Sequence, residues 1–89
     1  MDICQVIGNV WATKKEPALE GLKLMIVQTL YGDAPLQSVA ADLVGAGIGE
    51  RVLVVRGSSA RAAVARGNVP VDSAIVGIVD EMGIGGETK

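Results

Sequence analysis

The residues most capable of chemistry lie in the range 42–61. In its first half, three glycines alternate with other residues and are followed by an acid. Gly45, Gly47 and Gly49 precede Glu50, and the run is superficially similar to a nucleotide-binding loop. A dinucleotide-binding loop, however, has the spacing G-x-G-x-x-G and opens a helix. Here the third glycine comes one place too early, a strand-like run follows, and the lysine of a phosphate-binding loop is absent. The pattern therefore argues against a nucleotide site.

A second candidate site is the turn from Gly57 to Arg61, where two hydroxyls and an arginine stand at the start of a predicted helix. Free backbone N–H groups at a helix start attract anions, so an anion site is one interpretation. The interpretation that we favour is an ordinary helix whose N-terminus is capped by Ser58 or Ser59. Arg61 would then pair with a carboxylate of its own chain or of a neighbouring chain.

The chain has few side chains that could act in catalysis or bind a metal ion. There is no histidine and a single cysteine, Cys4, so neither a Ser-His pair nor a disulfide within the chain can form. The same shortage of ligands argues against a metal ion. The carboxylates Asp42, Glu50, Asp72 and Asp80 show no diagnostic spacing. We therefore expect no catalytic residue, no metal and no cofactor, and we assign Cys4 to the core or an interface.

The composition points to a small protein that assembles with other chains. Its 89 residues suffice for one domain, yet 49% of them are apolar, which is a high fraction for a domain with so small an interior. We expect the apolar side chains that do not fit in the core to lie in subunit interfaces. A net charge of −2 and only two aromatics, Trp11 and Tyr31, argue against nucleic acid, which needs a basic groove with stacking platforms. Trp11 is therefore interpreted as a packing or interface residue.

The order of apolar runs and turn signals predicts five strands and one short helix. Gly8, inside the first run, indicates a bend or bulge such as a barrel corner needs. The helix is predicted over Ala60 to Arg66, with Gly67 as its stop. The strands are predicted over Ile3 to Thr13, Leu22 to Leu30, Ser38 to Leu43, Arg51 to Arg56 and Ser73 to Asp80. This order predicts a mainly β fold, a small OB-like five-stranded β-barrel with one short α-helix.

One domain is expected over residues 1–82, followed by a flexible tail over 83–89, which is glycine-rich and polar. The N-terminus lacks the basic start and the long apolar stretch of a signal peptide, and no run is long enough for a membrane span. We therefore expect a cytoplasmic protein with no membrane partner.

Several blocks of residues, in one order and spacing, make the chain closely resemble the EutN/CcmL family of bacterial microcompartment vertex proteins. The resemblance covers the chain from Ile3 to Asp80. Trp11 departs from it, because a small or β-branched residue is commoner there. The blocks are Gly8-x-Val10, Ala12-Thr13-x-Lys15, Leu19-x-Gly21-x-Lys23-Leu24, Asp42 to Glu50, Gly57 to Arg61, Pro70-Val71-Asp72 and Ile75 to Asp80.

The resemblance implies a β-barrel subunit that assembles as a cyclic homo-pentamer and caps the five-fold corners of a polyhedral shell. The implied partners are the hexameric shell proteins of the flat facets, and the implied location is the microcompartment shell in the bacterial cytoplasm. The role would be structural. A hexameric ring stays open as an alternative, because a small change in subunit angle alters ring closure. A free OB-like oligomer that binds a small anion or single-stranded nucleic acid is the other alternative.

Within such a ring we predict roles for the glycine-rich segment. Alternate glycines leave one face bare, so neighbouring backbones can converge near the axis. We predict that Gly49, Glu50 and Arg61 serve the subunit interface, the latter two by pairing with each other or with groups across it. Asp72 is predicted to anchor the turn into the last strand by accepting backbone N–H bonds. The residues predicted to line an axial pore, with N–H groups toward the passage, are Val44, Gly45, Ala46, Gly47 and Ile48.

Overall fold

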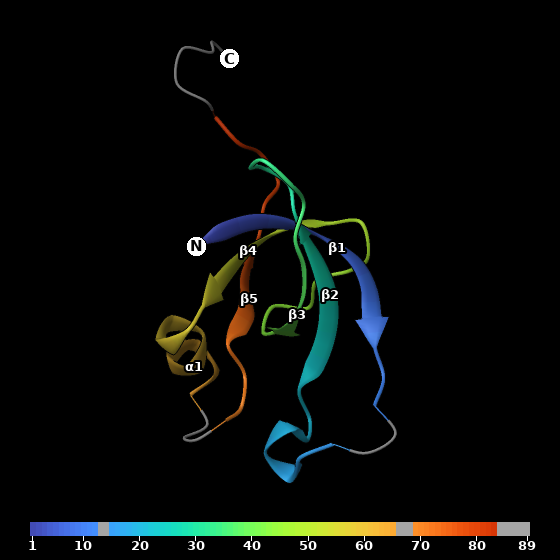
Figure 1. Ribbon diagram of the computed structural model, residues 1–89, viewed down its shortest axis with the longest axis vertical. Coiled ribbons are helices and arrows are strands. Elements are labelled where there is room, and N and C mark those ends of the chain that lie inside the picture. The colour runs from blue at the N-terminus through green and yellow to red at the C-terminus, as the bar shows by residue number, and fades with distance from the viewer. Residues whose placement is uncertain (13–14, 66–68, 84–89) are drawn as a thin grey trace.

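The computed structural model describes residues 1–12, 15–65 and 69–83 and contains a closed five-stranded barrel in the order β1-β2-β3-β5-β4 (Figure 1). A short 3-10 turn, Pro17–Leu19, lies between the first two strands, and helix α1 packs against β4 and β5. The predicted fold class is confirmed. The elements are β1 Asp2–Val10, β2 Lys23–Thr29, β3 Gln37–Asp42, β4 Arg51–Arg56, α1 Ser58–Val64 and β5 Ser73–Ile78.

Buried residues alternate with more exposed ones in β1 and β2 and so place one set of side chains inside the barrel, whereas β3, β4 and β5 each bury two or three consecutive residues. In β2, Met25 and Val27 are buried, while Leu24 and Ile26 face outward and stay half-buried. Cys4 is buried in β1, so of the two predicted places, core or interface, it takes the core. One cluster of side chains fills the barrel: Cys4, Val6, Met25, Val27, Ala40, Ala46, Val52, Val54 and Ile75.

Strand β1 bends at Gly8, as predicted. The pairing of β1 with β2 shifts register between Val6 and Gly8, which leaves Ile7 as an extra, exposed residue. A Cβ atom at Gly8 would lie 3.4 Å from Cδ1 of Ile26, so the absence of a side chain lets Ile26 cover the bend. This bulge allows β1 to pair with β2 on one side and with β4 on the other.

The barrel closes through a short parallel pairing of β3 with β5. Only Ala41 with Ala74 and Asp42 with Ile75 are in register there, and the N–H of Leu43 adds a bond of 3.2 Å to the carbonyl oxygen of Ile75. Because this seam is short, its stability depends on the side chains packed beneath it. Ile75 is one of these and is fully buried.

The N-terminal cap of α1 differs from the prediction. The helix begins at Ser58, two residues earlier than expected, and Gly57 occupies the N-cap position with φ of 64° and no side-chain cap hydrogen bond. The prediction that Ser58 or Ser59 caps the helix is therefore wrong. Both serines lie inside the first turn, because a glycine can adopt the left-handed backbone that turns the chain from β4 into the helix.

The remaining boundaries differ at the strand ends. β1 ends at Val10, earlier than predicted, and β5 ends at Ile78 instead of Asp80. The predicted helix end at Arg66 and stop at Gly67, as well as residues 84–89 of the predicted tail, lie outside the described residues. Among the described helices, none is long and apolar enough to cross a membrane.

Candidate functional site: the loop from β3 to β4

The glycine-rich segment forms a loop over residues 43–50 that is organised by the last residue of β3. One carboxylate oxygen of Asp42, Oδ1, accepts the N–H groups of Val44 at 3.0 Å and Gly45 at 3.1 Å. The other, Oδ2, accepts the N–H of Ala46 at 2.9 Å. The Asp42 side chain is fully buried, so its charge is compensated by these three donors and by a lysine.

That lysine, Lys23, joins the loop to the start of β2. Its Nζ lies 3.7 Å from Oδ2 of Asp42 and donates a hydrogen bond of 3.3 Å to the carbonyl oxygen of Ala46. The Lys23 side chain keeps 54% of its surface exposed, so it covers the carboxylate from the solvent side. The pair thus fixes the first half of the loop against the barrel.

The second half of the loop is held by Glu50. Its Oε1 accepts the N–H of Gly47 at 2.6 Å, while its own N–H donates to the carbonyl oxygen of Gly47 at 3.2 Å. Two backbone bonds then tie the loop to β1: Gly49 N–H to Val6 O at 2.8 Å, and Val6 N–H to Glu50 O at 3.0 Å. The loop is therefore a hydrogen-bonded unit, which suits a fixed contact surface.

These bonds correct one part of the predicted pore lining, the direction of the N–H groups, while the position of the loop at an axial pore stays a prediction. The N–H groups of residues 44–47 all bond to carboxylates of the same chain, so they do not face a passage. Ala46 is fully buried in the barrel core and exposes no side chain for a pore. The loop instead presents apolar side chains, with Val44 39% and Ile48 62% exposed. Gly45 and Gly49 adopt φ of 79° and 94°, which favours glycine at both positions.

Glu50 and Arg61 do not pair within one chain. Glu50 precedes β4 and Arg61 lies in α1, beyond its other end, and six strand residues span roughly 20 Å. The structure places Arg61 on the exposed side of α1, and in the described part of the chain its guanidinium has no carboxylate partner. The two residues therefore do not meet inside a subunit, and their pairing with each other or with other groups across an interface stays a prediction.

Asp72 also acts differently from the prediction. Its backbone carbonyl oxygen accepts the N–H of Gly57 at 2.9 Å, which joins the entry of β5 to the N-cap of α1. In the ranges 1–12, 15–65 and 69–83, no backbone N–H donates to its exposed carboxylate. The predicted anchoring by the Asp72 side chain is therefore wrong. The carboxylate points to solvent and is available to a partner.

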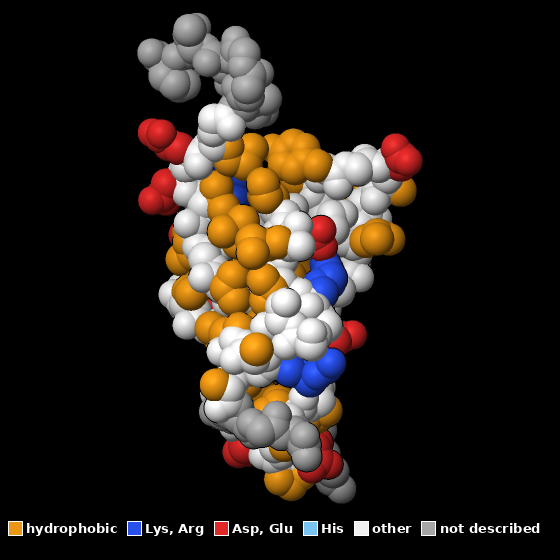
Figure 2. Space-filling view, turned by 90° about the vertical axis from the view of Figure 1, so that its left-hand side faces the viewer, with side chains coloured by type: hydrophobic (Ala, Val, Ile, Leu, Met, Phe, Trp, Pro, Cys, Tyr) orange, Lys and Arg blue, Asp and Glu red, His pale blue; other side chains and the backbone are white. Residues whose placement is uncertain are grey.

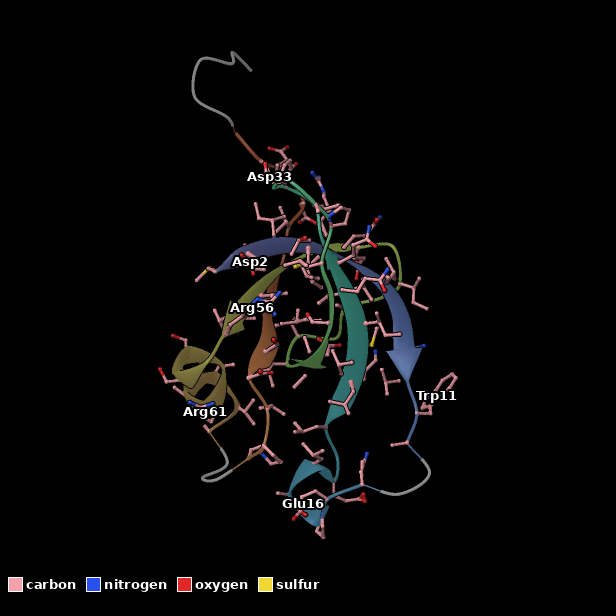
Figure 3. The ribbon with its side chains drawn as sticks, in the orientation of Figure 1. Asp2, Trp11, Glu16, Asp33, Arg56 and Arg61 are labelled. Atoms are coloured by element: carbon pink, nitrogen blue, oxygen red, sulfur yellow. The ribbon has the colours of Figure 1, made fainter. Side chains whose placement is uncertain are left out.

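A polar cluster at one end of the barrel was not predicted. Arg56 donates from Nε to Oδ2 of Asp2 at 2.7 Å (Figure 3). It also donates from one terminal nitrogen to the hydroxyls of Ser38 and Ser73 at 3.3 and 2.8 Å. One side chain thus connects β4 with β1, β3 and β5. The hydrogen bond from Arg56 holds the pKa of the Asp2 carboxyl below its ordinary value of 3.8.

The Asp2–Arg56 pair predicts an acid-sensitive contribution to stability. Because the pKa of Asp2 is lower in the folded state, the pair stabilises the fold above pH 3.8 and loses this effect as the pH falls through the lowered pKa. The pair is about 40% exposed, so its contribution is at most about 1 kcal/mol. In acid unfolding, Asp2→Asn should show a shallower loss of stability than wild type. Asp33→Asn, at an exposed loop carboxylate, is the control, and equal slopes for Asp2→Asn and wild type would contradict the assignment.

The described residues contain no group of three metal-ligating side chains. Burial raises the pKa of the Cys4 thiol above its ordinary value, so the thiol stays protonated inside the barrel. The arrangement as a whole offers a fixed loop, outward-facing apolar side chains and unpaired surface charges. These are features of an assembly surface.

Comparison with known proteins places the chain among shell proteins. The family described as "Ethanolamine utilisation protein EutN/carboxysome" matches residues 1–80. The carboxysome shell vertex protein CcmL of Synechocystis sp. is 45% identical over 87 residues, which cover 94% of this chain and 87% of that protein. The microcompartment shell vertex protein PduN of Salmonella typhimurium is 43% identical over 89 residues, 92% of this chain and 98% of that protein.

Solved structures agree with this placement. The structure of CcmL from Gloeobacter violaceus has a TM-score of 0.86 at 40% identity and covers 96% of this chain and 91% of that one. The pentameric microcompartment shell protein GrpN from Rhodospirillum rubrum has a TM-score of 0.82 at 41% identity, with coverage of 94% and 100%. Sequence and fold therefore agree over nearly the full length of these proteins, and the chain belongs to the EutN/CcmL family.

Proposed function

We propose that this chain is a structural shell protein that forms a homo-pentamer and caps the five-fold vertices of a bacterial microcompartment. The observation that carries the proposal is the similarity, in sequence and fold, to a shell protein described as pentameric. The proposed location is the microcompartment shell in the bacterial cytoplasm, with hexameric facet proteins as neighbours. No residue is proposed to be catalytic, and the relatives named above are shell components.

The surface of the barrel supports assembly on physical grounds. Large apolar side chains remain exposed on the single chain, and hydrophobic side chains gather in a band on the face that carries α1 (Figure 2). Exposed patches of this kind mark contact surfaces. In a cyclic ring, one face of each subunit meets a different face of the next, so two distinct surfaces are needed. The most exposed large apolar residues are Met1, Trp11, Tyr31, Leu36 and Ile48.

Native mass spectrometry of the full chain tests the ring directly. Five copies of the 9.1 kDa chain are expected as the dominant species at micromolar concentration. A mass of six copies would support the hexameric alternative, and a monomer at every concentration would overturn the proposal. Electron microscopy of shells made with and without this chain then tests its place. Shells that close their corners equally well without it would contradict the vertex role.

The loop 43–50 is proposed as a contact surface of the ring, with Val44 and Ile48 as its apolar side chains. Gly47 is the position at which this can be tested, because its φ is not positive and a Cβ there would meet only Oε1 of Glu50 at 3.5 Å. The single chain thus has room for a side chain at this position. Gly45 and Gly49 are poor probes, because substitution at either would strain the backbone.

Gly47→Arg is expected to leave the barrel folded and to prevent or strongly weaken pentamer formation. The added side chain would project from a surface that neighbours approach closely. Circular dichroism checks the fold and native mass checks the ring, with Gly47→Ala as the smaller matched change. If Gly47→Arg forms pentamers as well as wild type, the loop does not lie between subunits. Shell closure by the same variant then tells whether the loop instead faces the facet proteins.

Arg61 is the better charge probe of the interface. Glu50 fixes the loop of its own chain, so its reversal would disturb both the loop and any contact. Arg61 has no such role, and its guanidinium is exposed. We propose that Arg61 meets a group of the neighbouring subunit.

A further inference from the structure

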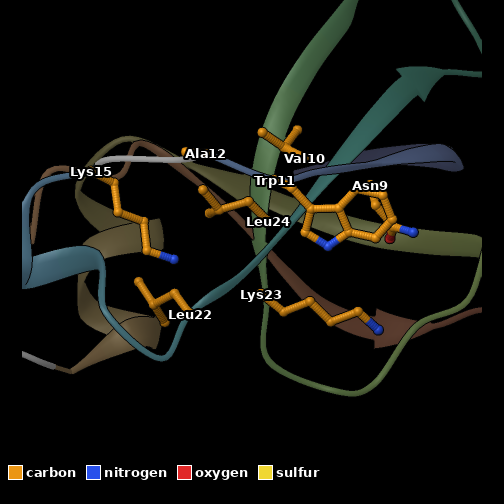
Figure 4. Close-up of a pocket in the computed structure, with 8 residues that line it drawn as sticks. All are labelled: Asn9, Val10, Trp11, Ala12, Lys15, Leu22, Lys23 and Leu24. Atoms are coloured by element: carbon orange, nitrogen blue, oxygen red, sulfur yellow. The ribbon is translucent and has the colours of Figure 1, made fainter.

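A tryptophan stands almost fully exposed on the outside of the barrel. Trp11 follows β1 directly and keeps 88% of its surface accessible, more than any other large apolar side chain of the described residues. It borders a groove of about 400 Å³ that Val10 and Leu24 line with apolar surface (Figure 4). Lys15 and Lys23 border the same groove and give it a positive edge. An exposed indole beside a cationic edge is a suitable anchor for a protein contact.

A shallow hollow of about 360 Å³ lies beside helix α1. It is bordered by Arg61 of α1 and by the segment Val69–Asp72 that leads into β5. Pro70 and Asp72 are exposed there, and Val69 forms a buried floor. Figure 3 labels Trp11 and Arg61 on opposite sides of the barrel, both in its lower half. The hollow therefore offers a cation, an apolar ring and a carboxylate on the side away from Trp11.

We propose that Trp11 of one subunit packs into the hollow between Arg61 and Pro70 of the next subunit in the ring. The Arg61 guanidinium lies over the indole face as a cation–π contact, and Pro70 covers the indole with apolar surface. Lys15, beside Trp11, then faces Asp72 across the interface. This inference rests on the proposed ring and names the contact that holds neighbouring subunits together.

Charge complementarity favours a second copy as the occupant. At the groove, the ammonium group of Lys15 forms no ion pair with a carboxylate of the described residues. At the hollow, the carboxylate of Asp72 likewise forms none with a described residue. Because Trp11 and Arg61 lie on opposite sides of one subunit, each copy can give its indole to one neighbour and receive the indole of the other, which is the head-to-tail contact that a ring requires. The tryptophan is also the single one in the chain, so its environment can be followed alone.

Fluorescence of Trp11 in the full chain tests the contact. In dilute, dissociated subunits the emission should be that of a solvated indole and acrylamide should quench it freely. On assembly into the ring the emission should shift to the blue, and quenching should become several times weaker. A ring in which Trp11 is quenched as freely as in the dissociated subunit would overturn this inference and leave the pentamer itself unaffected. A chain that forms no ring would instead overturn the proposed function.

Variants give an independent test. Trp11→Ala should raise the dissociation constant between subunits by about 30-fold or more, as for other aromatic anchors, and leave the barrel folded because Trp11 is exposed. Tyr31→Ala, at the other exposed aromatic, is the matched control and should weaken assembly much less, because Tyr31 borders neither the groove nor the hollow. Lys15→Glu and Asp72→Lys should each weaken the ring, and the double variant should recover it. If Trp11→Ala matches Tyr31→Ala, or the double variant shows no recovery, the contact is wrong.

Discussion

Asp42→Ala is expected to lower the free energy of unfolding by about 2–3 kcal/mol, because hydrogen bonds to a charged group each contribute about 1.5–3 kcal/mol and the variant removes three of them. The expected loss is smaller than the sum of the three bonds, because water can enter the vacated space and bond to some of the freed N–H groups. The amides of Val44, Gly45 and Ala46 should exchange hydrogen much faster, while amides inside the strands keep their relative protection. Chemical denaturation and hydrogen exchange measure the two effects.

Two further variants sharpen this result. Asp42→Asn keeps the side-chain shape and one acceptor oxygen, but loses the charge that faces Lys23, so its loss of stability should be intermediate. Asp80→Ala removes an exposed carboxylate and should change stability by less than about 0.5 kcal/mol. If Asp42→Ala unfolds at the same denaturant concentration as wild type, the loop does not depend on this carboxylate. The assembly role proposed for the loop would then lose its structural basis.

Ile75→Ala is expected to destabilise the barrel by about 2–5 kcal/mol, the usual cost of a cavity left by a large buried side chain. Ile75 is fully buried and lies at the point where β5 pairs with both β3 and β4. Because the parallel seam with β3 is short, few other contacts replace the lost packing. For a domain of this size such a loss is a large share of total stability, so dilute subunits should be partly unfolded at room temperature.

The matched control lies on the same strand. Ile78→Ala removes the same atoms from a side chain that is 38% exposed, and its cost should be clearly smaller. Ring formation stabilises the folded subunit, because only folded subunits assemble. The apparent loss of stability in Ile75→Ala should therefore become smaller as the protein concentration rises. Thermal unfolding at several concentrations measures both effects. Equal midpoints for the two variants would show that the seam, and not the core beneath it, determines stability.

Much of the fold could be predicted because strand signals are local. The strand predicted over Leu22 to Leu30 is observed as β2 Lys23–Thr29, and β4 was predicted with the observed limits, Arg51–Arg56. Gly8 marked the bulge correctly. Boundaries next to turns were less accurate, since they depend on backbone pairing with other strands. The helix start was missed because Gly57, and not a serine, makes the turn that precedes it.

The candidate site was predicted only in part. The glycine-rich loop was identified as the important segment, yet its organising residue, Asp42, was considered as a catalytic carboxylate and as part of the family resemblance, and not as an acceptor for the loop amides. A local signal existed: an aspartate just before a glycine-containing turn commonly accepts N–H groups two to four residues onward. The bonds that Asp42 forms with residues 44–46 follow this pattern. Applied to this position, the rule would also have shown that the loop amides are not free for a pore.

By itself, the sequence determined the strand pattern, the family resemblance and the scarcity of catalytic side chains, because each depends on residue types or on neighbours along the chain. Only the tertiary structure decided which distant charges meet. Lys23 faces Asp42 across the β2–β3 pair and Arg56 reaches Asp2 across the β1–β4 pair, because strand pairing brings together residues that are far apart in the sequence. The same holds for Trp11 and Arg61, whose places on opposite sides of the subunit follow from the barrel and not from any local pattern.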